Sequence, residues 1–221
     1  MKVEIFSIMK NEELMLPFYL KHYQDRFSDC TINVYDNGST DNSIQICKDA
    51  SCNIGIFPVY TEELLKDWKN NIWKNSDADW IIVCDIDELL DISMTDLLSL
   101  QEDVNVIKTQ GYNMIDVTHD DLPIEQLTYG APSEGYSKLV MFKNKSISEI
   151  NYLAGAHVAN PLPNPVFSDD VFNLLHYKRE NFSLKNLKKG HEKYQGEGIL
   201  LDGTLETIFN DYLLPHAIKI L

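Results

Sequence analysis

Three carboxylates stand within four positions at the end of an apolar run. The run Trp80–Cys84 is rich in β-prone residues, and Asp85, Asp87 and Glu88 follow it at once. Such runs are typical of buried strands, and ligand sites in open α/β sheets lie just beyond the carboxyl ends of strands. On an extended backbone Asp85 and Asp87 point to the same face, where they repel each other unless a cation lies between them. Hard divalent ions such as Mg²⁺ or Mn²⁺ take oxygen ligands of this kind, often one or two carboxylates plus substrate phosphates.

The alternative interpretation of this stretch is purely local. In that case the acids form a strand-to-helix turn, and Asp87 or Asp91 caps the next helix. An Asp-x-Asp pair alone does not decide between the two, and the elements that would position it are therefore needed.

The first half of the chain alternates between strand-like and helix-like periodicity. The spacing of apolar residues predicts strands over 3–9, 31–35, 54–58 and 80–84. It predicts helices over 14–27 and 61–74, and a third that begins near Ser39, Thr40 or Asp41 and continues through Ile44–Cys47. Strand and helix repeated three times before a fourth strand indicate an α/β fold with a doubly wound, mostly parallel sheet.

The second half is less regular. We expect a short helix over 94–100 and strands over 104–109, 136–142, 147–152 and 171–177, then a lysine-rich helix over 183–194 and a helix with a tail over 204–221. The segment Gly111–Gly135 is rich in Asp, Pro, Gly and Tyr and shows little periodicity. A loop of that length inside a compact domain is usually functional or mobile, so we expect it to shape specificity.

Composition narrows the classes of function. The 221 residues are 44% hydrophobic and 24% charged, as expected for one globular domain, and the formal net charge is −15. This charge argues against unspecific binding of nucleic acid or of an anionic membrane surface, but a metal ion would still allow a nucleotide substrate. The first residues lack the pattern of a signal peptide, no apolar run approaches a membrane span, and the four cysteines form no CxxC pair. We therefore expect a cytoplasmic protein with reduced thiols.

Three motifs close predicted strands in a set order. Met9-Lys-Asn-Glu12 closes the first strand, Val34-Tyr-Asp-Asn-Gly-Ser-Thr-Asp41 the second and Asp85-Ile-Asp-Glu88 the fourth. In this combination the chain resembles the family 2 glycosyltransferases and their relatives on the GT-A fold. The resemblance covers roughly residues 3–195 and continues in Gly111-Tyr-Asn-Met, Tyr136-Ser-Lys138, Gly155-Ala-His157 and Leu175-His176-Tyr177.

The resemblance implies a Rossmann-like, mixed and mostly parallel central sheet flanked by helices. It implies a single GT-A domain over 1–221, with a nucleotide-binding half (1–110), a half that binds the acceptor and completes the metal site (111–195), and a C-terminal helix and tail (196–221). The implied activity is metal-dependent, inverting transfer of a sugar from a nucleoside-diphosphate donor, with a UDP-sugar first in rank. The acceptor would be a hydroxyl of a glycan or of a lipid-linked glycan, as in a hexosyltransferase of polysaccharide biosynthesis.

The turns after the first two strands are the expected site of the nucleotide. Lys10, Asn11 and Glu12 would meet Asp36 at the carboxyl edge of the sheet, where a base and ribose could lie. A carboxylate such as Asp36 accepts hydrogen bonds from a uracil-type edge or from ribose hydroxyls. Its alternative role is to bond its own backbone in the turn, and the two roles are compatible.

The metal ion implied by the resemblance is Mn²⁺ or Mg²⁺. Asp85 would contact ribose or metal, Asp87 would ligate the ion, and a histidine from the C-terminal half would complete the coordination. We rank His176 above His157 for that role, and the other histidine could then hold a phosphate or the acceptor. Lys138 is a candidate phosphate contact, with a solvated lysine on an edge strand as its alternative, while Glu88 is expected to support the ligands.

Inverting transfer needs a base that removes the proton of the acceptor hydroxyl. We select Asp116, which follows the strand predicted after the acidic turn, over Asp120, Asp121 and Glu134 in the same segment. The chain lacks the Glu-Asp pair that many members of the family use, and a solvated loop acid is the alternative for each of these residues.

Two other functions remain open. A sugar-phosphate nucleotidyltransferase uses a similar sheet, but its Gly-rich phosphate loop has no counterpart in Lys10-Asn-Glu-Glu. A non-catalytic module that binds nucleotide-sugars would explain the missing Glu-Asp pair. The lysines of 185–193 would suit peripheral contact with a lipid-phosphate acceptor at a membrane, although a solvated helix face explains them equally, and the oligomeric state is not set by the sequence.

Overall fold

A computed structural model describes residues 1–117, 123–177 and 217–221. Its strands are β1 (Val3–Met9), β2 (Cys30–Asp36), β3 (Asn53–Ile56), β4 (Trp80–Val83), β5 (Glu88–Asp91), β6 (Val106–Ile115), β7 (Tyr129–Pro132), β8 (Met141–Lys143), β9 (Phe167–His176) and β10 (Ile218–Lys219). Its helices are α1 (Leu16–Arg26), α2 (Ser43–Asp49), α3 (Glu62–Asn71) and α4 (Met94–Ser99), and its 3₁₀ turns are η1 (Ile124–Gln126), η2 (Glu134–Tyr136) and η3 (Ala154–Ala156).

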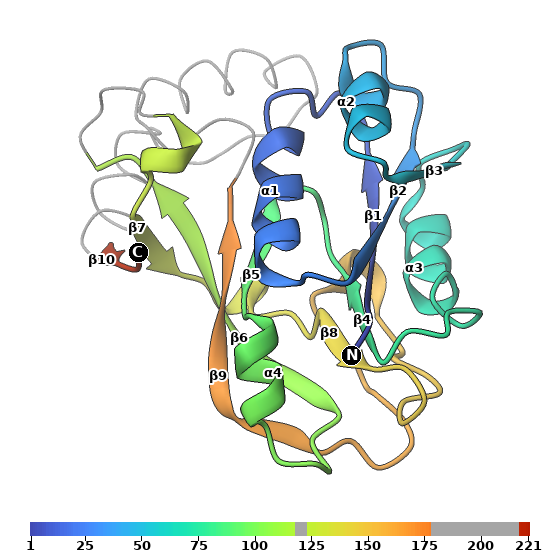
Figure 1. The fold of residues 1–221 in the computed structure, drawn as a ribbon, viewed down its shortest axis with the longest axis vertical. Coiled ribbons are helices and arrows are strands. Elements are labelled where there is room, and N and C mark those ends of the chain that lie inside the picture. Colours follow the sequence, from blue (N-terminus) through green and yellow to red (C-terminus); the bar gives the residue numbers. More distant parts are fainter. Residues whose placement is uncertain (118–122, 178–216) are drawn as a thin grey trace.

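The strands form one mixed sheet of order β10-β7-β6-β8-β4-β1-β2-β3, and β9 pairs with both β6 and β5. Strands β1 to β4 run parallel to one another, whereas β8, β7, β5 and β10 each join an antiparallel pair. In Figure 1 the parallel strands lie at the right and β6, β7 and β9 at the left, with β5 between them. The expected α/β class, with a largely parallel sheet flanked by helices, is confirmed.

Alternation along β4 divides the core between the two faces of the sheet. Trp80 and Ile82 pack into one cluster with the apolar residues of α1, and Ile81 and Val83 pack into a second cluster with Trp73, just after α3. This period of two is why an unbroken apolar run is needed for a strand that is covered on both sides. Helices α1 and α3 therefore fix the strand that leads to the acidic turn.

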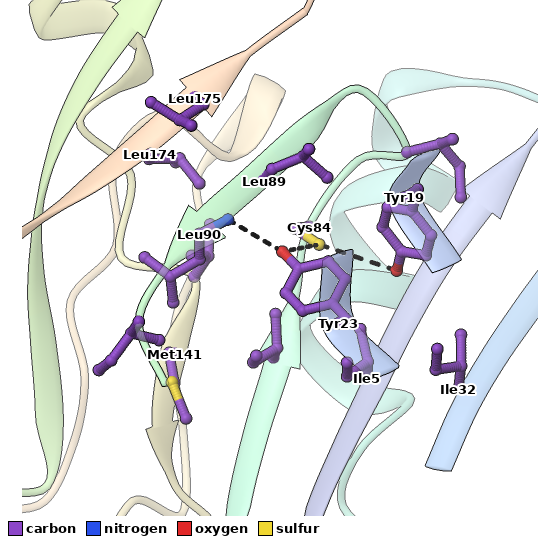
Figure 2. Close-up of a cluster of buried hydrophobic side chains, with 14 of the residues drawn as sticks. Ile5, Tyr19, Tyr23, Ile32, Cys84, Leu89, Leu90, Met141, Leu174 and Leu175 are labelled. Atoms are coloured by element: carbon purple, nitrogen blue, oxygen red, sulfur yellow. Dashed lines mark hydrogen bonds between the residues drawn. The ribbon is translucent and has the colours of Figure 1, made fainter. Parts of the chain in front are cut away.

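Two tyrosines of helix α1 contact the residues on either side of the acidic turn. Figure 2 shows Tyr19 and Tyr23 directed at Cys84, with the Tyr23 hydroxyl 3.5 Å from the Cys84 sulfur. The same hydroxyl accepts from the Leu90 N–H at 3.1 Å and donates to the Glu88 carbonyl at 3.2 Å. Burial raises the pKa of the Cys84 thiol to about 12, so it acts as a neutral packing group. Contacts from α1 thus hold the turn between β4 and β5 in place.

Three predictions for the second half are wrong. The segment Gly111–Gly135 is not an irregular loop, because its first residues continue β6 and its end forms β7. Only Met141 onward of the predicted strand 136–142 is a strand, because η2 occupies its start, and 147–152 forms no strand beyond a single bridge at Glu149. The predicted helix 183–194 lies outside the described residues, as does most of 204–221. No helix in the described residues is long and apolar enough to cross a membrane.

Candidate functional site

A cavity of about 910 Å³ opens at the carboxyl ends of β1 and β4. This size is typical of sites for small molecules and cofactors, which range from about 300 to 1,000 Å³. Its wall is polar and carries acids, lysines and two histidines. The titratable side chains on the wall, tyrosines aside, are Lys10, Glu12, Glu62, Lys69, Asp85, Asp87, Glu88, Lys138, His157 and His176.

The acidic stretch forms a tight turn rather than a continued strand. The Glu88 N–H donates to the Asp85 carbonyl at 3.1 Å, and the Asp85 N–H donates to Oε2 of Glu88 at 3.2 Å. Ile86 between the two aspartates is buried, while the side chains of Asp85 and Asp87 are 39% and 26% exposed and both line the cavity. The two aspartates are therefore not on an extended backbone, but the turn still delivers both carboxylates to one cavity. The capping role considered for Asp87 or Asp91 belongs instead to Ser93, which caps α4.

Two buried lysines hold Asp85. Lys69 Nζ lies 2.7 Å from one carboxylate oxygen and Lys138 Nζ lies 3.4 Å from the other. Lys138 also lies 2.5 Å from Oε1 of Glu88, and the side chains of these two residues are 4% and 1% exposed. Lys138 is thus not a solvated edge-strand lysine, and the contacts of Glu88 fit the supporting role expected of it. We call these four residues the lysine–carboxylate network.

Charge pairing outweighs burial in this network. Burial would raise the pKa of Asp85, but Lys69 and Lys138 lower it overall, so the carboxyl stays ionised. Burial likewise opposes the charge on Lys69 and Lys138, whereas Asp85 and Glu88 raise the pKa of both lysines above their ordinary value. Asp85, Lys69 and Lys138 are therefore charged at neutral pH.

Lys69 was not among the residues selected from the sequence. It occupies the buried stripe of α3, four residues after Leu65 and four before Trp73, and its side chain is 3% exposed. A lysine in the apolar stripe of an amphipathic helix is costly unless it is paired, and this pattern is the signal that could have revealed it.

Asp87 has a different surrounding. In the part of the chain that the structure describes, no lysine or arginine pairs with it, and His176 Nε2 lies 3.6 Å from its Oδ2. The other ring nitrogen of His176, Nδ1, donates to Oδ1 of Asn113 at 2.8 Å. In a neutral imidazole this hydrogen bond selects the tautomer whose Nε2 lone pair lies on the side of the carboxylate. An imidazole lone pair and a carboxylate that face each other are suited to sharing a cation.

Strand register explains the placement of His176. It is the last residue of β9 and pairs with Asn113 on β6 and with Glu88 on β5. Tyr136 stacks on the His176 ring with centroids 3.7 Å apart, and Lys138 Nζ lies 5.3 Å from the same tyrosine ring. Gly111 permits this arrangement, because a Cβ there would lie 2.2 Å from the Tyr136 backbone.

The donor set fits Mn²⁺ or Mg²⁺ at Asp87 and His176. Both metals accept carboxylate ligands, and such sites often use few protein ligands and leave the others to water and phosphates. Within the described residues no group of three or more acidic, histidine or cysteine side chains is placed to hold an ion by itself. A metal at this position would thus depend on ligands from a substrate.

The turn after β1 meets the turn after β2, as expected for the nucleotide end. The Asn11 N–H donates to Ser39 Oγ at 3.0 Å, and Asn11 Oδ1 accepts from the Thr40 N–H at 2.7 Å. Lys10 and Glu12 line the cavity, whereas Asn11 does not. Asn11 instead connects the two turns through these hydrogen bonds, and its φ is 56°.

Asp36 serves its own turn. Its carboxylate accepts from the Gly38 N–H and the Ser39 N–H, each at 3.0 Å. Asn37, which follows it, lines the cavity while Asp36 does not. The local role considered for Asp36 is observed, and the nucleotide-binding role stays a prediction.

His157 lies on the same cavity wall and contacts Tyr136. Its ring and the Tyr136 ring meet in a T-shaped arrangement with centroids 5.8 Å apart, and no contact with Asp87 or His176 is seen among the described residues. Its Nδ1 donates to the Gly135 carbonyl.

The structure does not bring the predicted base to the cavity. Asp116 follows β6, has no exposed surface and is not on the cavity wall. Glu134 lies in η2 and is also away from the wall, and Asp120 and Asp121 lie outside the described residues.

No family model and no curated protein matches the chain. Among solved structures, TarS 1–349 from S. aureus is 14% identical and matches 96% of this chain and 73% of its own length, with a TM-score of 0.46. The same protein in complex with UDP-GlcNAc is 13% identical and matches 95% of this chain and 73% of its own length, with a TM-score of 0.47. Glucosyl-3-phosphoglycerate synthase from Mycobacterium tuberculosis, in complex with Mn²⁺, UDP and glucosyl-3-phosphoglycerate, is 15% identical over 51% of this chain and 44% of its own, with a TM-score of 0.36. These values describe a similarity in the course of the chain and assign no substrate to this protein.

Proposed function

We propose that this protein is a metal-dependent, inverting glycosyltransferase that moves a sugar from a nucleoside-diphosphate donor to a hydroxyl of a glycan or lipid-linked glycan. The observation that carries the proposal is the Asp87–His176 pair, which faces the cavity beside the lysine–carboxylate network. A diphosphate would supply the missing metal ligands, and the ion would offset its negative charge at a wall that carries more acids than lysines.

Asp87 and His176 would hold Mn²⁺ or Mg²⁺. When bound, the ion offsets the charge that develops on the departing nucleoside diphosphate. Asn113 keeps His176 in the tautomer that can ligate, and Tyr136 holds the ring in place from one face.

Asp85 would act through Lys69 and Lys138. By fixing two ammonium groups at the wall, it would hold their N–H donors beside the diphosphate without allowing the lysines to reach into solvent. Donors that are placed in advance need no reorganisation during the reaction, and groups of this kind contribute strongly to catalysis.

The nucleotide would lie toward the turns after β1 and β2. Lys10, Glu12 and Asn37 reach the wall there, and a uracil edge or ribose offers complementary donors and acceptors. Asp36 would support this end by holding the turn that presents Asn37. UDP is the nucleotide to test first.

Isothermal titration calorimetry with UDP, in the presence and absence of Mn²⁺, tests the proposal. We expect binding that requires Mn²⁺ and that is lost in Asp87→Ala. Lys21→Ala is the matched control, because Lys21 lies on the exposed side of α1 and its ion pair within the described residues is with Asp25 at 2.6 Å. Mn²⁺-independent binding, or binding unchanged in Asp87→Ala, would count decisively against the proposed site.

Turnover separates an enzyme from a binding module. Purified protein is incubated with Mn²⁺ and a panel that includes UDP-glucose and UDP-GlcNAc, and released UDP is measured. A glycosyltransferase slowly transfers sugar to water, so we expect UDP from at least one donor. Tight binding without UDP release from any donor would leave a non-catalytic nucleotide-sugar-binding protein as the better description.

A further inference from the structure

One imidazole on the cavity wall has no part in the proposed metal and donor sites. His157 is exposed, lines the cavity and contacts Tyr136, the same ring that stacks on His176. Tyr136 therefore contacts both an imidazole beside the proposed metal position and an exposed imidazole that a second substrate could meet.

The tautomer of His157 is set by its backbone contact. Nδ1 donates its hydrogen to the Gly135 carbonyl, so the lone pair resides on Nε2. Within the described part of the chain, Nε2 has no hydrogen-bond partner. An imidazole is prepared to take a proton on one ring nitrogen when a fixed acceptor orients the other nitrogen. Here the Gly135 carbonyl orients Nδ1 and leaves Nε2 to take the proton.

The segment that carries His157 is tightly held. Tyr152 N–H donates to Asn70 Oδ1 at 2.7 Å, Asn70 Nδ2 donates back to the Tyr152 carbonyl at 3.1 Å, and the Tyr152 hydroxyl donates to the Leu139 carbonyl at 2.7 Å. Asn70 directly follows Lys69 on α3. The loop that bears His157 is thus bonded to α3, the helix that carries Lys69 of the lysine–carboxylate network.

Gly155 makes room for the ring. Its φ is 74°, and a Cβ at this position would lie 2.8 Å from His157 Cδ2, closer than such contacts occur. The imidazole therefore packs directly against the backbone of its own turn, which restricts its orientation.

The carboxylates near the cavity are less suited than His157 to take a proton from a substrate. Asp85 and Glu88 are bound by lysines, and Asp87 faces His176. Asp116, the base expected from the sequence, is fully buried and away from the wall. Glu62 at the start of α3 and Glu12 after β1 also line the cavity and are the competing carboxylates.

We infer that His157 is the general base that deprotonates the acceptor hydroxyl, an inference that rests on the proposed glycosyltransferase function. His157 Nε2 takes the hydroxyl proton as the acceptor oxygen forms a bond to the anomeric carbon. The bond from that carbon to the phosphate oxygen breaks, and its electron pair leaves with the nucleoside diphosphate. The imidazolium then returns the proton to solvent.

The test compares His157→Asn with the wild-type protein. Asparagine keeps a donor for the Gly135 carbonyl but cannot accept a proton, so we expect UDP release from UDP-glucose or UDP-GlcNAc to fall by about 10²–10⁴-fold. Calorimetric binding of UDP with Mn²⁺ should stay within about threefold of wild type. Unchanged UDP release in His157→Asn would overturn the inference and leave the proposed function intact.

Chemical rescue excludes a merely structural role. Because His157 is exposed, added imidazole should restore UDP release in His157→Ala in proportion to its concentration. Failure of rescue, or loss of turnover in Glu62→Gln with retention in His157→Asn, would assign the base elsewhere. Absence of UDP release from the wild-type protein with every donor would overturn the proposed function, and the inference with it.

Discussion

The surroundings of Asp85 and Asp87 differ although the two residues are two positions apart. Asp85 is held by Lys69 and Lys138, so its charge is balanced by the protein itself. Asp87 faces only His176 among basic partners in the described residues, so its charge is not balanced in the same way. The difference teaches that two acids of one motif can have separate surroundings. Asp85 takes part in internal charge pairs, whereas Asp87 is the carboxylate that the proposed function assigns to a cation.

The largest effect should come from removing a cation of the internal network. Lys138→Met leaves Glu88, which is 1% exposed, without its ion-pair partner, and we expect a loss of about 3–5 kcal/mol in the free energy of unfolding. Urea denaturation measures it. The double variant Lys138→Met/Glu88→Leu should recover most of the loss, and a single variant within about 1 kcal/mol of wild type would show that the network is not a structural unit.

Asp87→Asn should leave folding intact but remove function. We expect UDP release to fall by about 10²–10³-fold, since the proposed ion loses its carboxylate and the leaving group its charge compensation. Thermal unfolding without ligand should remain close to wild type because the side chain is not part of the buried network. If Asp87→Asn unfolded as readily as Lys138→Met, the two acids would not differ as described.

Asn113→Ala tests the support behind His176. Loss of the acceptor for Nδ1 frees the tautomer, and we expect Mn²⁺ affinity in the presence of UDP to fall by about 10–100-fold. Asn113→Asp keeps an acceptor and should restore most of the affinity. Calorimetric titration of Mn²⁺ gives both values, and equal affinity in wild type and Asn113→Ala would remove His176 from the metal site.

The smallest expected effect is a dependence of stability on pH. The pKa of Asp85 in the folded protein is lower than its unfolded value of about 3.9. The contribution of Asp85 to the free energy of unfolding is therefore fully present above the unfolded pKa. It is lost as the pH falls toward the folded pKa. We expect wild type to lose less than about 1 kcal/mol between pH 5 and pH 3 from this group, because 39% of the side chain is exposed to screening solvent. Asp85→Asn should lack this component in urea denaturation at the two pH values.

Local patterns predicted the first half of the fold well. The strands expected over 3–9 and 80–84 are observed within one residue, because their apolar runs and the helix stripes between them are properties of neighbouring residues. The second half followed the sequence less closely. There β6 and β7 pair across the segment Gly111–Gly135, and such pairing depends on distant partners that no local period encodes.

The site was predictable to the same extent. The position of Asp85 and Asp87 follows from the end of a buried strand, and both line the cavity as expected. Lys69, one of the two lysines that bind Asp85, comes from a helix stripe, and Asn113 reaches His176 through strand register. These partners could not be found from the acidic motif alone, since they meet it only when the chain is folded.

The position of His176 at the end of β9 has a consequence for synthesis of the chain. During translation the acidic turn emerges with Lys69 already available, whereas Lys138 follows 50 positions after Glu88 and His176 still later. The nascent N-terminal half thus carries Glu88 without its buried partner and Asp87 without its histidine. The proposed metal site cannot form before β9 has paired with β5 and β6. Donor binding by a folding chain would therefore report that this pairing is complete.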